Sequence, residues 1–468
     1  MAEKTKGEQL KEKLFLSQKS AYETQKDAQI EKAYEYCENY KKFLDKCKTE
    51  RESVEYAVEY LEKNGFVPFE YGKKYNSGDK VYFNNRGKSI YIITVGEKPV
   101  EEGLYVAAAH VDSPRIDLKQ HPLYEDGGMA FFKTHYYGGI KKFQWVTIPL
   151  SLHGTVIKAD GEKLDISIGE DENDPIFYIT DVLPHLAQDQ VVKPMSKVFN
   201  GEMLNVLCGS RPYDDEKVSE KIKLNVLSLL YDKYGITEAD LLSSELCLVP
   251  SQKARDVGFD RSMILAYGHD DRVCAYPILT AAVECSKKTP QHTIVTIFAD
   301  KEETGSDGNT GMQSYAFIDI LTELCENMGS NPRKMFANSK CLSADVNACF
   351  DPNFAEVYES RNSAFINKGV CVTKFTGSGG KSSTNDAHAE FVGYVRSVLD
   401  KNEVVWQTGE LGKVDQGGGG TVAKYLSKLN MDVIDIGVPV LAMHAPCEIV
   451  SKTDVYSAYC AFCAFFGD

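Results

Sequence analysis

Residues Thr293 to Ser306 read TIVTIFADKEETGS, and this stretch decides the fold. Its first half, Thr293 to Ala299, is a short run of β-branched and apolar residues, which is typical of a strand buried on both faces by helices. Its second half places Asp300, Glu302 and Glu303 directly after that strand. In open α/β sheets, ligands bind outside the carboxyl ends of the strands. The stretch therefore predicts a helix-covered sheet with a functional site at the end of this strand.

Three other segments repeat the pattern of a short apolar run followed by a histidine or an acidic residue. His110-Val111-Asp112 follows Leu104 to Ala109, Asp345 follows Cys341 to Ala344, and His444 follows Val433 to Val438 through a short loop. A fifth segment, His269-Asp270-Asp271-Arg272, precedes an apolar stretch. Histidines and carboxylates form the mixed ligand set that suits Zn²⁺ and tolerates Mn²⁺ or Co²⁺. The set is too large for one tetrahedral zinc, so we expect two ions that share a bridging carboxylate.

The adjacent carboxylates of Glu302 and Glu303 indicate hydrolytic chemistry. Two like charges repel at the buried end of a strand unless a cation or a proton separates their roles. One carboxylate can bind metal while its neighbour takes a proton from a water whose pKa the metal has lowered toward about 7. We therefore expect metal-dependent hydrolysis.

The length and the texture of the chain predict two domains. A chain of 468 residues exceeds the roughly 250–300 residues at which a single core stops growing. From Pro114 to Pro250 the sequence changes to short alternating segments, with a hairpin predicted at Asp160-Gly161 and a helix before Gly235. We predict a mixed-sheet α/β domain, covered by helices, from residues 1–113 and 251–468, interrupted by a β-rich domain of residues 114–250.

Composition excludes several classes of partner. The net charge of −15 would repel a phosphate backbone, so we expect no nucleic-acid partner. No stretch approaches the about 18 apolar residues of a membrane span, and Met1 to Lys13 lack the apolar segment of a secretory signal. The 13 cysteines, including the CxxC pair Cys460 and Cys463 in an apolar run, are typical of buried thiols in a reducing compartment. The sequence predicts a soluble, cytoplasmic protein without a membrane partner.

Five segments, in order from about residue 80 to the C-terminus, resemble the aspartyl aminopeptidase family of zinc metallo-aminopeptidases. They are His110-Val111-Asp112-Ser113-Pro114-Arg115, His269-Asp270-Asp271-Arg272, Asp300-Lys301-Glu302-Glu303-Thr304-Gly305-Ser306, Ser343-Ala344-Asp345 and Met443-His444. The resemblance implies that two zinc ions are bound by His110, Asp270, Glu303, Asp345 and His444, with Asp270 as the bridge. It also implies that Glu302 is the general base, that Asp112 orients His110, and that the Asp270-Asp271 bond is cis.

The same resemblance implies an assembly. The β-rich insertion would drive dimerisation, and dimers would build a homododecamer, a shell with the active sites facing inward. His185, in Pro184-His185-Leu186-Ala187, would reach the active site of a neighbouring subunit.

Two glycine-rich segments are candidates for substrate contacts. Lys381 follows Gly379-Gly380, but a phosphate loop would need glycine where the chain has Phe375, so Lys381 is instead a candidate partner for an acidic substrate side chain. Gly418 and Gly419, in a run of four glycines, form either a flexible linker or a backbone that closely approaches a ligand. The stretch after Asp345 lacks a histidine that is common in the eukaryotic aspartyl enzymes.

The predicted function is removal of N-terminal residues from peptides by a water that bridges two metal ions, with a possible preference for acidic residues. Another two-metal amidohydrolase, a deacylase or a carboxypeptidase, could use the same ligands. A non-catalytic, shell-forming protein is the other alternative. Such a protein would be expected to lack a ligand or the base, and this chain lacks neither.

Overall fold

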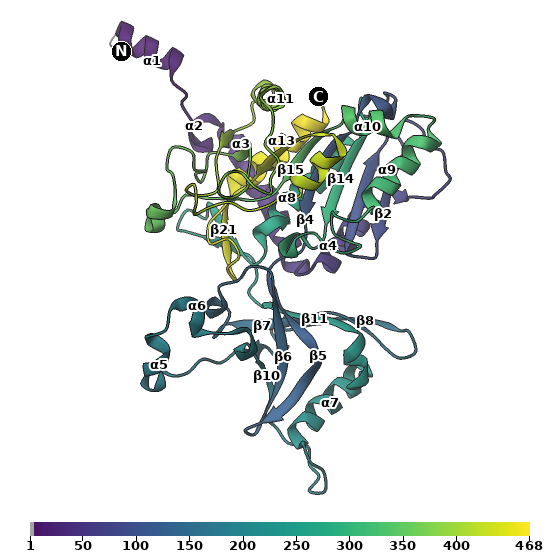
Figure 1. The fold of residues 1–468 in the computed structure, drawn as a ribbon, viewed down its shortest axis with the longest axis vertical. Helices are drawn as coiled ribbons and strands as arrows, with labels where there is room; N and C mark the ends of the chain where they lie inside the picture. Colours follow the sequence, from purple (N-terminus) through teal and green to yellow (C-terminus); the bar gives the residue numbers. More distant parts are fainter. Residues whose placement is uncertain (1–3) are drawn as a thin grey trace.

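The short apolar runs form a nine-stranded mixed sheet in the computed structural model, which describes residues 4–468 (Figure 1). The strands lie in the order β1 (Val67–Pro68), β2 (Lys80–Asn85), β3 (Ser89–Thr94), β14 (Ile294–Ala299), β4 (Tyr105–His110), β15 (Lys340–Ala344), β19 (Asp432–Gly437), β17 (Val370–Thr373) and β18 (Trp406–Thr408). Every residue of β3, β4 and β14 is buried. The predicted α/β class, with a mixed sheet, is confirmed.

The central strands β14, β4, β15 and β19 are neighbours and run parallel. In their register Ala299 lies beside His110, and Ser343 lies beside Ala108. The carboxyl ends of these strands therefore lie next to one another. The histidine and acidic residues that follow them are brought together although they are far apart in the sequence.

Helices cover both faces of this sheet (Figure 1). One face packs against α3 (Asp27–Lys46), α4 (Glu50–Glu62), α8 (His269–Cys285), α11 (Ala389–Lys401) and α13 (Lys452–Phe466), and the other against α9 (Ala316–Asn327), α10 (Pro332–Asn338) and α12 (Ala423–Leu426). Ile90 and Ile92 of β3 enter the first core, whereas Tyr91 and Ile93 enter the second. Because both faces are buried, the strands are continuous apolar runs.

Residues 115–250 contain a second, antiparallel sheet, which forms the lower body in Figure 1. Its strands lie in the order β11 (Ser244–Pro250), β5 (Arg115–Asp126), β6 (Met129–Tyr137), β10 (Val206–Gly209), β9 (Phe177–Tyr178), β7 (Pro149–Ile157) and β8 (Lys163–Ile168). Strand β11 also pairs with β7, so the sheet closes on itself. Helix α7 (Lys221–Tyr234) packs Ile222 and Val226 into the core of this sheet and ends at Gly235, whose φ of 67° favours glycine.

Short elements complete the chain. A three-stranded sheet joins β12 (Arg255–Val257), β13 (Met263–Ala266) and β21 (Glu448–Ser451), and β16 (Asn347–Ala348) pairs with β20 (Pro439–Val440). The remaining helices are α1 (Lys6–Leu14), which projects from the upper body (Figure 1), α2 (Ala21–Thr24), α5 (Gln188–Val191) and α6 (Met195–Val198). Within residues 4–468, no helix has the length and apolar character that a bilayer span requires.

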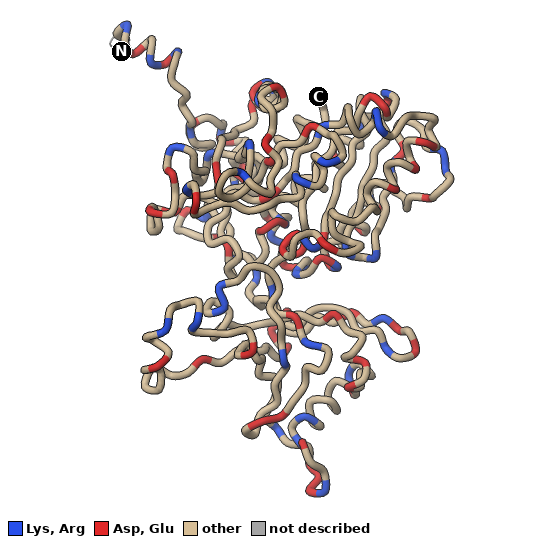
Figure 2. Tube along the Cα trace, viewed as in Figure 1, with Lys and Arg blue, Asp and Glu red and all other residues tan. Residues whose placement is uncertain are grey.

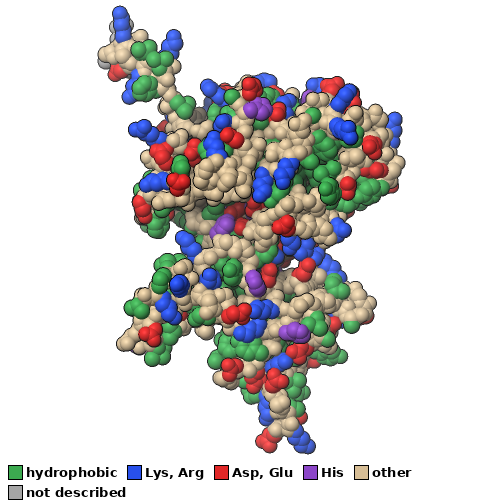
Figure 3. All heavy atoms as spheres, in the orientation of Figure 1, with side chains coloured by type: hydrophobic (Ala, Val, Ile, Leu, Met, Phe, Trp, Pro, Cys, Tyr) green, Lys and Arg blue, Asp and Glu red, His purple; other side chains and the backbone are tan. Residues whose placement is uncertain are grey.

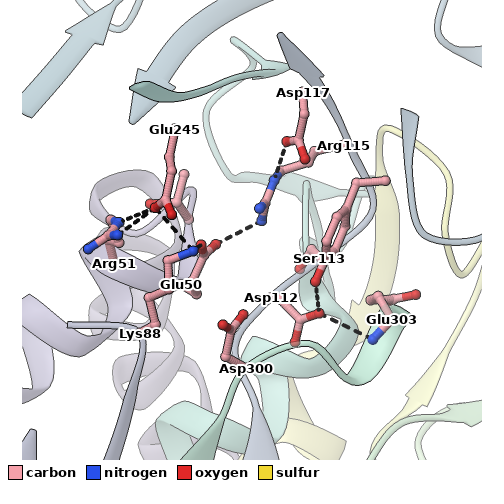
Figure 4. Close-up of polar contacts among 12 residues, drawn as sticks. Glu50, Arg51, Lys88, Asp112, Ser113, Arg115, Asp117, Glu245, Asp300 and Glu303 are labelled. Atoms are coloured by element: carbon pink, nitrogen blue, oxygen red, sulfur yellow. Dashed lines mark hydrogen bonds and ion pairs between the residues drawn. The ribbon is translucent and has the colours of Figure 1, made fainter. Parts of the chain in front are cut away.

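Charged side chains fill the contact between the two bodies (Figure 4). Glu50 of α4 accepts a hydrogen bond from Arg115 Nη1 of β5 at 2.7 Å, and Lys88 Nζ lies 3.5 Å from the other carboxylate oxygen. Arg51 and Lys88 both pair with Glu245 of β11. Burial would raise the pKa of Glu50, but Arg115 and Lys88 outweigh it and lower the pKa to about 2. Elsewhere acidic and basic residues are interspersed along the chain in both bodies (Figure 2).

Candidate metal centre

His110 and Asp270 face each other at the carboxyl end of β4. His110 Nδ1 lies 2.9 Å from the backbone carbonyl oxygen of Asp112, which can only accept, so Nδ1 carries the proton. In the neutral ring this leaves a lone pair on Nε2, which lies 3.1 Å from Asp270 Oδ1. Two acceptors at this distance repel unless a proton or a cation lies between them.

His444 repeats this arrangement on the other oxygen of Asp270. Its Nδ1 donates to the backbone carbonyl of Gly139 at 2.8 Å, and its Nε2 lies 3.2 Å from Asp270 Oδ2. Glu303 Oε1 is 3.6 Å from this Nε2, while Asp345 Oδ1 is 3.8 Å from His110 Nε2. Asp270 therefore lies between two groups of candidate ligands.

The donor set fits a metal. Three sets of residues each bring their ligand-type atoms within 4.8 Å of one another. They are His110 with Asp270 and Glu303, Asp270 with Asp271 and Asp345, and His110 with Glu302 and Asp345. The buried atoms Asp270 Oδ1, Asp271 Oδ1 and Glu303 Oε1 have no hydrogen-bond partner. Burial, together with Asp270, raises the pKa of Glu303 well above its ordinary value. A divalent cation would use these oxygens and offset the like charges.

The segment that carries Asp270 is held from several sides. Its N–H donates to Glu448 Oε2 at 3.1 Å, and its carbonyl accepts from Ser113 Oγ at 2.6 Å. The Asp270-Asp271 peptide bond is cis, as the resemblance implies. Asp271 Oδ2 accepts from the His110 N–H at 3.3 Å. The backbone around both residues is therefore fixed by side chains from β21 and from the turn after β4.

Glu302 begins a short helical turn that follows β14, and it lines the same cavity as His110 and His444. Burial raises the pKa of Glu302 to about 7, with further contributions from Asp112 and Asp270. A carboxyl group whose pKa is near neutrality can accept and return a proton, as a general base must.

Asp112 has a wider role than the sequence predicts. His110 Nδ1 is closer to the Asp112 carbonyl oxygen than to its carboxylate, at 2.9 against 3.4 Å. The fully buried carboxylate instead accepts the backbone N–H groups of Glu302 at 3.1 Å and Glu303 at 3.2 Å. Asp112 therefore holds the base and a candidate ligand in position, in addition to its contact with His110.

Three residues that the sequence analysis missed complete the centre. Tyr137 Oη donates to Asp112 Oδ2 at 2.7 Å, Gly139 accepts from the His444 ring, and Glu448 Oε1 accepts the His444 N–H at 2.7 Å. Tyr137 and Gly139 belong to the antiparallel body. No local pattern in the sequence marks Tyr137 or Gly139, because the partner of each is more than 20 residues away and on the other body.

The centre opens into a cavity of about 480 Å³ at the waist of the molecule, where acidic and histidine side chains gather in a hollow (Figure 3). Gly418 and Gly419 line this cavity, and a Cβ on Gly418, whose φ is 115°, would lie 2.5 Å from Ser378. Lys381 does not line it, because its ammonium pairs with Asp386 at 3.0 Å.

His185 also lies apart from the centre. It is exposed on a turn of the antiparallel body, residues Pro184–Leu186, and does not line the cavity of its own chain. Its predicted contact with a neighbouring subunit stays a prediction.

A helix-covered sheet that gathers histidines and carboxylates around a cavity is the arrangement of a metal-dependent hydrolase. Residues 43–466 match the family described as aminopeptidase I zinc metalloprotease (M18), and the chain belongs to this family. It is a zinc metallo-aminopeptidase, and the predicted membership of the family that includes the aspartyl aminopeptidases is confirmed.

Relatives match the chain over nearly its whole length. The probable M18 family aminopeptidase 1 of Clostridium acetobutylicum is 47% identical and is covered to 99%, against 97% of this chain. The crystal structure of the M18 aminopeptidase from Thermotoga maritima matches with a TM-score of 0.92 at 42% identity, covering 97% of this chain and 99% of that one. The S. cerevisiae mApe1 dodecamer shares the fold, with a TM-score of 0.74 at 21% identity over 92% of this chain and 95% of that one.

Proposed function

We propose that the chain is a two-metal aminopeptidase in which Asp270 bridges the ions. The observation that carries this proposal is that the two oxygens of Asp270 face two different histidine nitrogens, at 3.1 and 3.2 Å. His110 and Asp345 would hold one ion, and His444 and Glu303 the other. Zn²⁺ accepts this mixture of nitrogen and oxygen ligands, as do Mn²⁺ and Co²⁺.

Glu302 is the proposed general base. When bound, such ions polarise a peptide carbonyl and lower the pKa of water. The Glu302 carboxylate takes a proton from the attacking water, and the carbon–nitrogen bond of the substrate then breaks as Glu302 returns this proton to the leaving amine. Asp112 keeps Glu302 in place through the Glu302 N–H.

A preference for acidic N-terminal residues is part of the proposal. Lys424 of α12 lines the cavity of the metal centre, and its Nζ lies 4.9 Å from the centre of the Tyr425 ring. Within residues 4–468 it forms no ion pair. The sequence-based candidate, Lys381, is already paired with Asp386 and lies 3.9 Å from the centre of the Phe375 ring. Lys424 is therefore the better placed cation for a substrate carboxylate.

Hydrolysis of aminoacyl anilides carrying Asp, Glu, Leu, Ala or Lys tests activity and preference together. We expect chelation to abolish release and zinc to restore it, with Asp and Glu cleaved fastest. Lys424→Met should lower the rates for Asp and Glu by about tenfold and leave Leu unchanged, because it removes one charge-assisted contact. Lys428→Met, an exposed lysine one turn further along, is the control.

Three outcomes would overturn parts of this proposal. Fastest release from Leu or Lys would remove the acidic preference. Cleavage of amino-blocked peptides but not of free ones would indicate a deacylase. No release from any substrate by the zinc-loaded protein would favour a scaffold.

The proposed assembly is a homododecamer built from dimers. Residues 114–250 would form the association domain, and residues 1–113 and 251–468 the catalytic domain. The dodecameric state of the S. cerevisiae relative supports the assembly, and the closed antiparallel sheet of β5 to β11 supports the division. His185 is exposed on this sheet's body, where a neighbouring subunit could be reached.

Light scattering tests the assembly, because a 52.1 kDa monomer and a dodecamer differ twelvefold in mass. We expect the dodecamer, and we expect His185→Gln to preserve it while lowering kcat. His121→Gln, at another exposed histidine of the same body, is the control. A fully active monomer would contradict both the assembly and the role of His185.

A further inference from the structure

Tyr137 is a buried tyrosine at the end of β6, on the antiparallel body, and its hydroxyl reaches the catalytic turn of the other body. Its Oη donates to Asp112 Oδ2 at 2.7 Å. The same carboxylate accepts the N–H groups of Glu302 and Glu303, at 3.1 and 3.2 Å. One hydroxyl thus reaches the proposed base and a proposed ligand through a single shared acceptor, the Asp112 carboxylate.

Two cations lie near the ring of Tyr137. The guanidinium carbon of Arg115 lies 4.3 Å from the ring centre, and Lys301 Nζ lies 5.8 Å from it. Arg115 is itself fixed by Glu50 at 2.7 Å and by Asp117 at 2.8 Å (Figure 4). Lys301 directly precedes Glu302 in the catalytic turn. The tyrosine therefore has little freedom, and it contacts the turn by its ring as well as by its hydroxyl.

The backbone that follows Tyr137 also lies next to proposed metal ligands. Gly139, two residues further on, accepts the Nδ1 proton of His444 at 2.8 Å. A Cβ on Gly138 would lie 3.2 Å from Glu303 Oε2, which leaves little room for a side chain between the strand end and the ligand. The residues that follow β6 thus lie next to His444 and Glu303, the two residues proposed to hold the same ion.

We propose that Tyr137 is a positioning residue for the hydrolysis, through which the antiparallel body of the same chain sets the geometry of the catalytic turn. The hydroxyl fixes the Asp112 carboxylate, and this carboxylate fixes the backbone of Glu302 and Glu303. Without the hydroxyl, the buried carboxylate loses a donor and can rotate toward its remaining partners. The side chain of Glu302 then spends less time at the position from which it accepts the proton. This inference rests on the proposed role of Glu302.

Tyr137→Phe tests the proposal, because it removes only the hydroxyl and keeps the ring near Arg115 and Lys301. In the zinc-loaded assembly we expect kcat to fall about tenfold and KM to change less than about twofold. We expect the zinc content to stay at the wild-type value and the melting temperature to fall by only a few degrees, because the two backbone donors to the Asp112 carboxylate remain. Tyr136→Phe, the neighbouring residue, is the matched control, since Tyr136 is exposed at 37%.

A double variant separates this inference from the proposed function. In a Glu302→Gln background, Tyr137→Phe should change the residual rate less than about twofold, since the hydroxyl acts through the base. An unchanged kcat for Tyr137→Phe, with Glu302→Gln inactive, would overturn the inference alone. Loss of zinc, or unfolding of Tyr137→Phe at the assay temperature, would also overturn it, because the role would then be structural. A fully active Glu302→Gln would instead overturn the proposed function.

Discussion

Glu302→Gln is expected to lower kcat by about 10²–10⁴-fold while the protein keeps its zinc. Glutamine has the size and shape of glutamate, so the cavity and the hydrogen bond from the Glu302 N–H to Asp112 are preserved. Its amide cannot take a proton from the attacking water at neutral pH, however, and the proton transfer is lost. The measurements are kcat on the fastest anilide and the zinc content per subunit.

Glu303→Gln is the matched comparison, because it changes the adjacent residue in the same way. It is expected to lose zinc, since Glu303 offers an oxygen 3.6 Å from His444 Nε2. The comparison is needed because a ligand-type atom of Glu302 also lies within 4.8 Å of those of His110 and Asp345. Equal zinc loss in both variants would make Glu302 a ligand, and near-full activity of Glu302→Gln would remove it from the chemistry.

Arg115→Met is expected to lower the free energy of unfolding by about 3–5 kcal/mol, because it leaves the Glu50 carboxylate buried without its closest cation. Trp145 lies in the core of the antiparallel body, and Trp406 lies on β18 of the other body. Urea denaturation of a Trp406→Phe background, followed by fluorescence, therefore reports on the body that holds Arg115. Arg261→Met is the control, because the Arg261 side chain is 74% exposed in its pair with Asp256 and its loss should leave the denaturation midpoint nearly unchanged.

The pair of Glu50 and Arg115 also predicts a dependence of stability on pH. Glu50 has its pKa lowered from an ordinary value of 4.5 to about 2. A lowered carboxyl pKa contributes stability that is present above the unfolded-state pKa and lost as the pH falls through the folded-state value. Wild-type stability should therefore fall between about pH 4.5 and 2, and less so in Arg115→Met. The double variant Glu50→Gln with Arg115→Met should be more stable than Arg115→Met alone. If it is not, the buried Glu50 charge is not the cause of the stability lost in Arg115→Met.

The helix-covered sheet could be predicted because each central strand carries its own signal. The run Thr293 to Ala299 is apolar since both its faces are buried, and β14 covers Ile294–Ala299. The charged residues that follow indicate where such strands end, so His110, Glu303 and Asp345 could be grouped before any contact was known. The order of β14, β4, β15 and β19 depends on contacts between strands far apart in the sequence, and the pattern of residues does not give it.

The contacts made by the antiparallel body could not be predicted in the same way. Tyr137 acts on Asp112 through a hydrogen bond across the two bodies, and neither residue type nor spacing indicates that pairing. Lys381 shows that a contact within one loop is also difficult to predict. Lys381 is predicted as a partner for an acidic substrate side chain, and in the structure its ammonium pairs with Asp386, five residues away. Such local ion pairs depend on loop geometry, which the pattern of residues does not fix.

The way the chain enters and leaves the antiparallel body bears on how such an enzyme can evolve. The entering strand β5 and the leaving strand β11 are paired, with Ile116 beside Leu248, so the two junctions lie next to each other. A segment with adjacent ends can be gained or exchanged as one cassette without reordering the sheet that receives it. Tyr137 and Gly139 travel with that cassette, however. An ancestor that acquired this segment would have gained a new surface and, with it, the residues that contact Asp112 and His444. Later exchanges would then succeed only between segments that place the same residues at the end of β6.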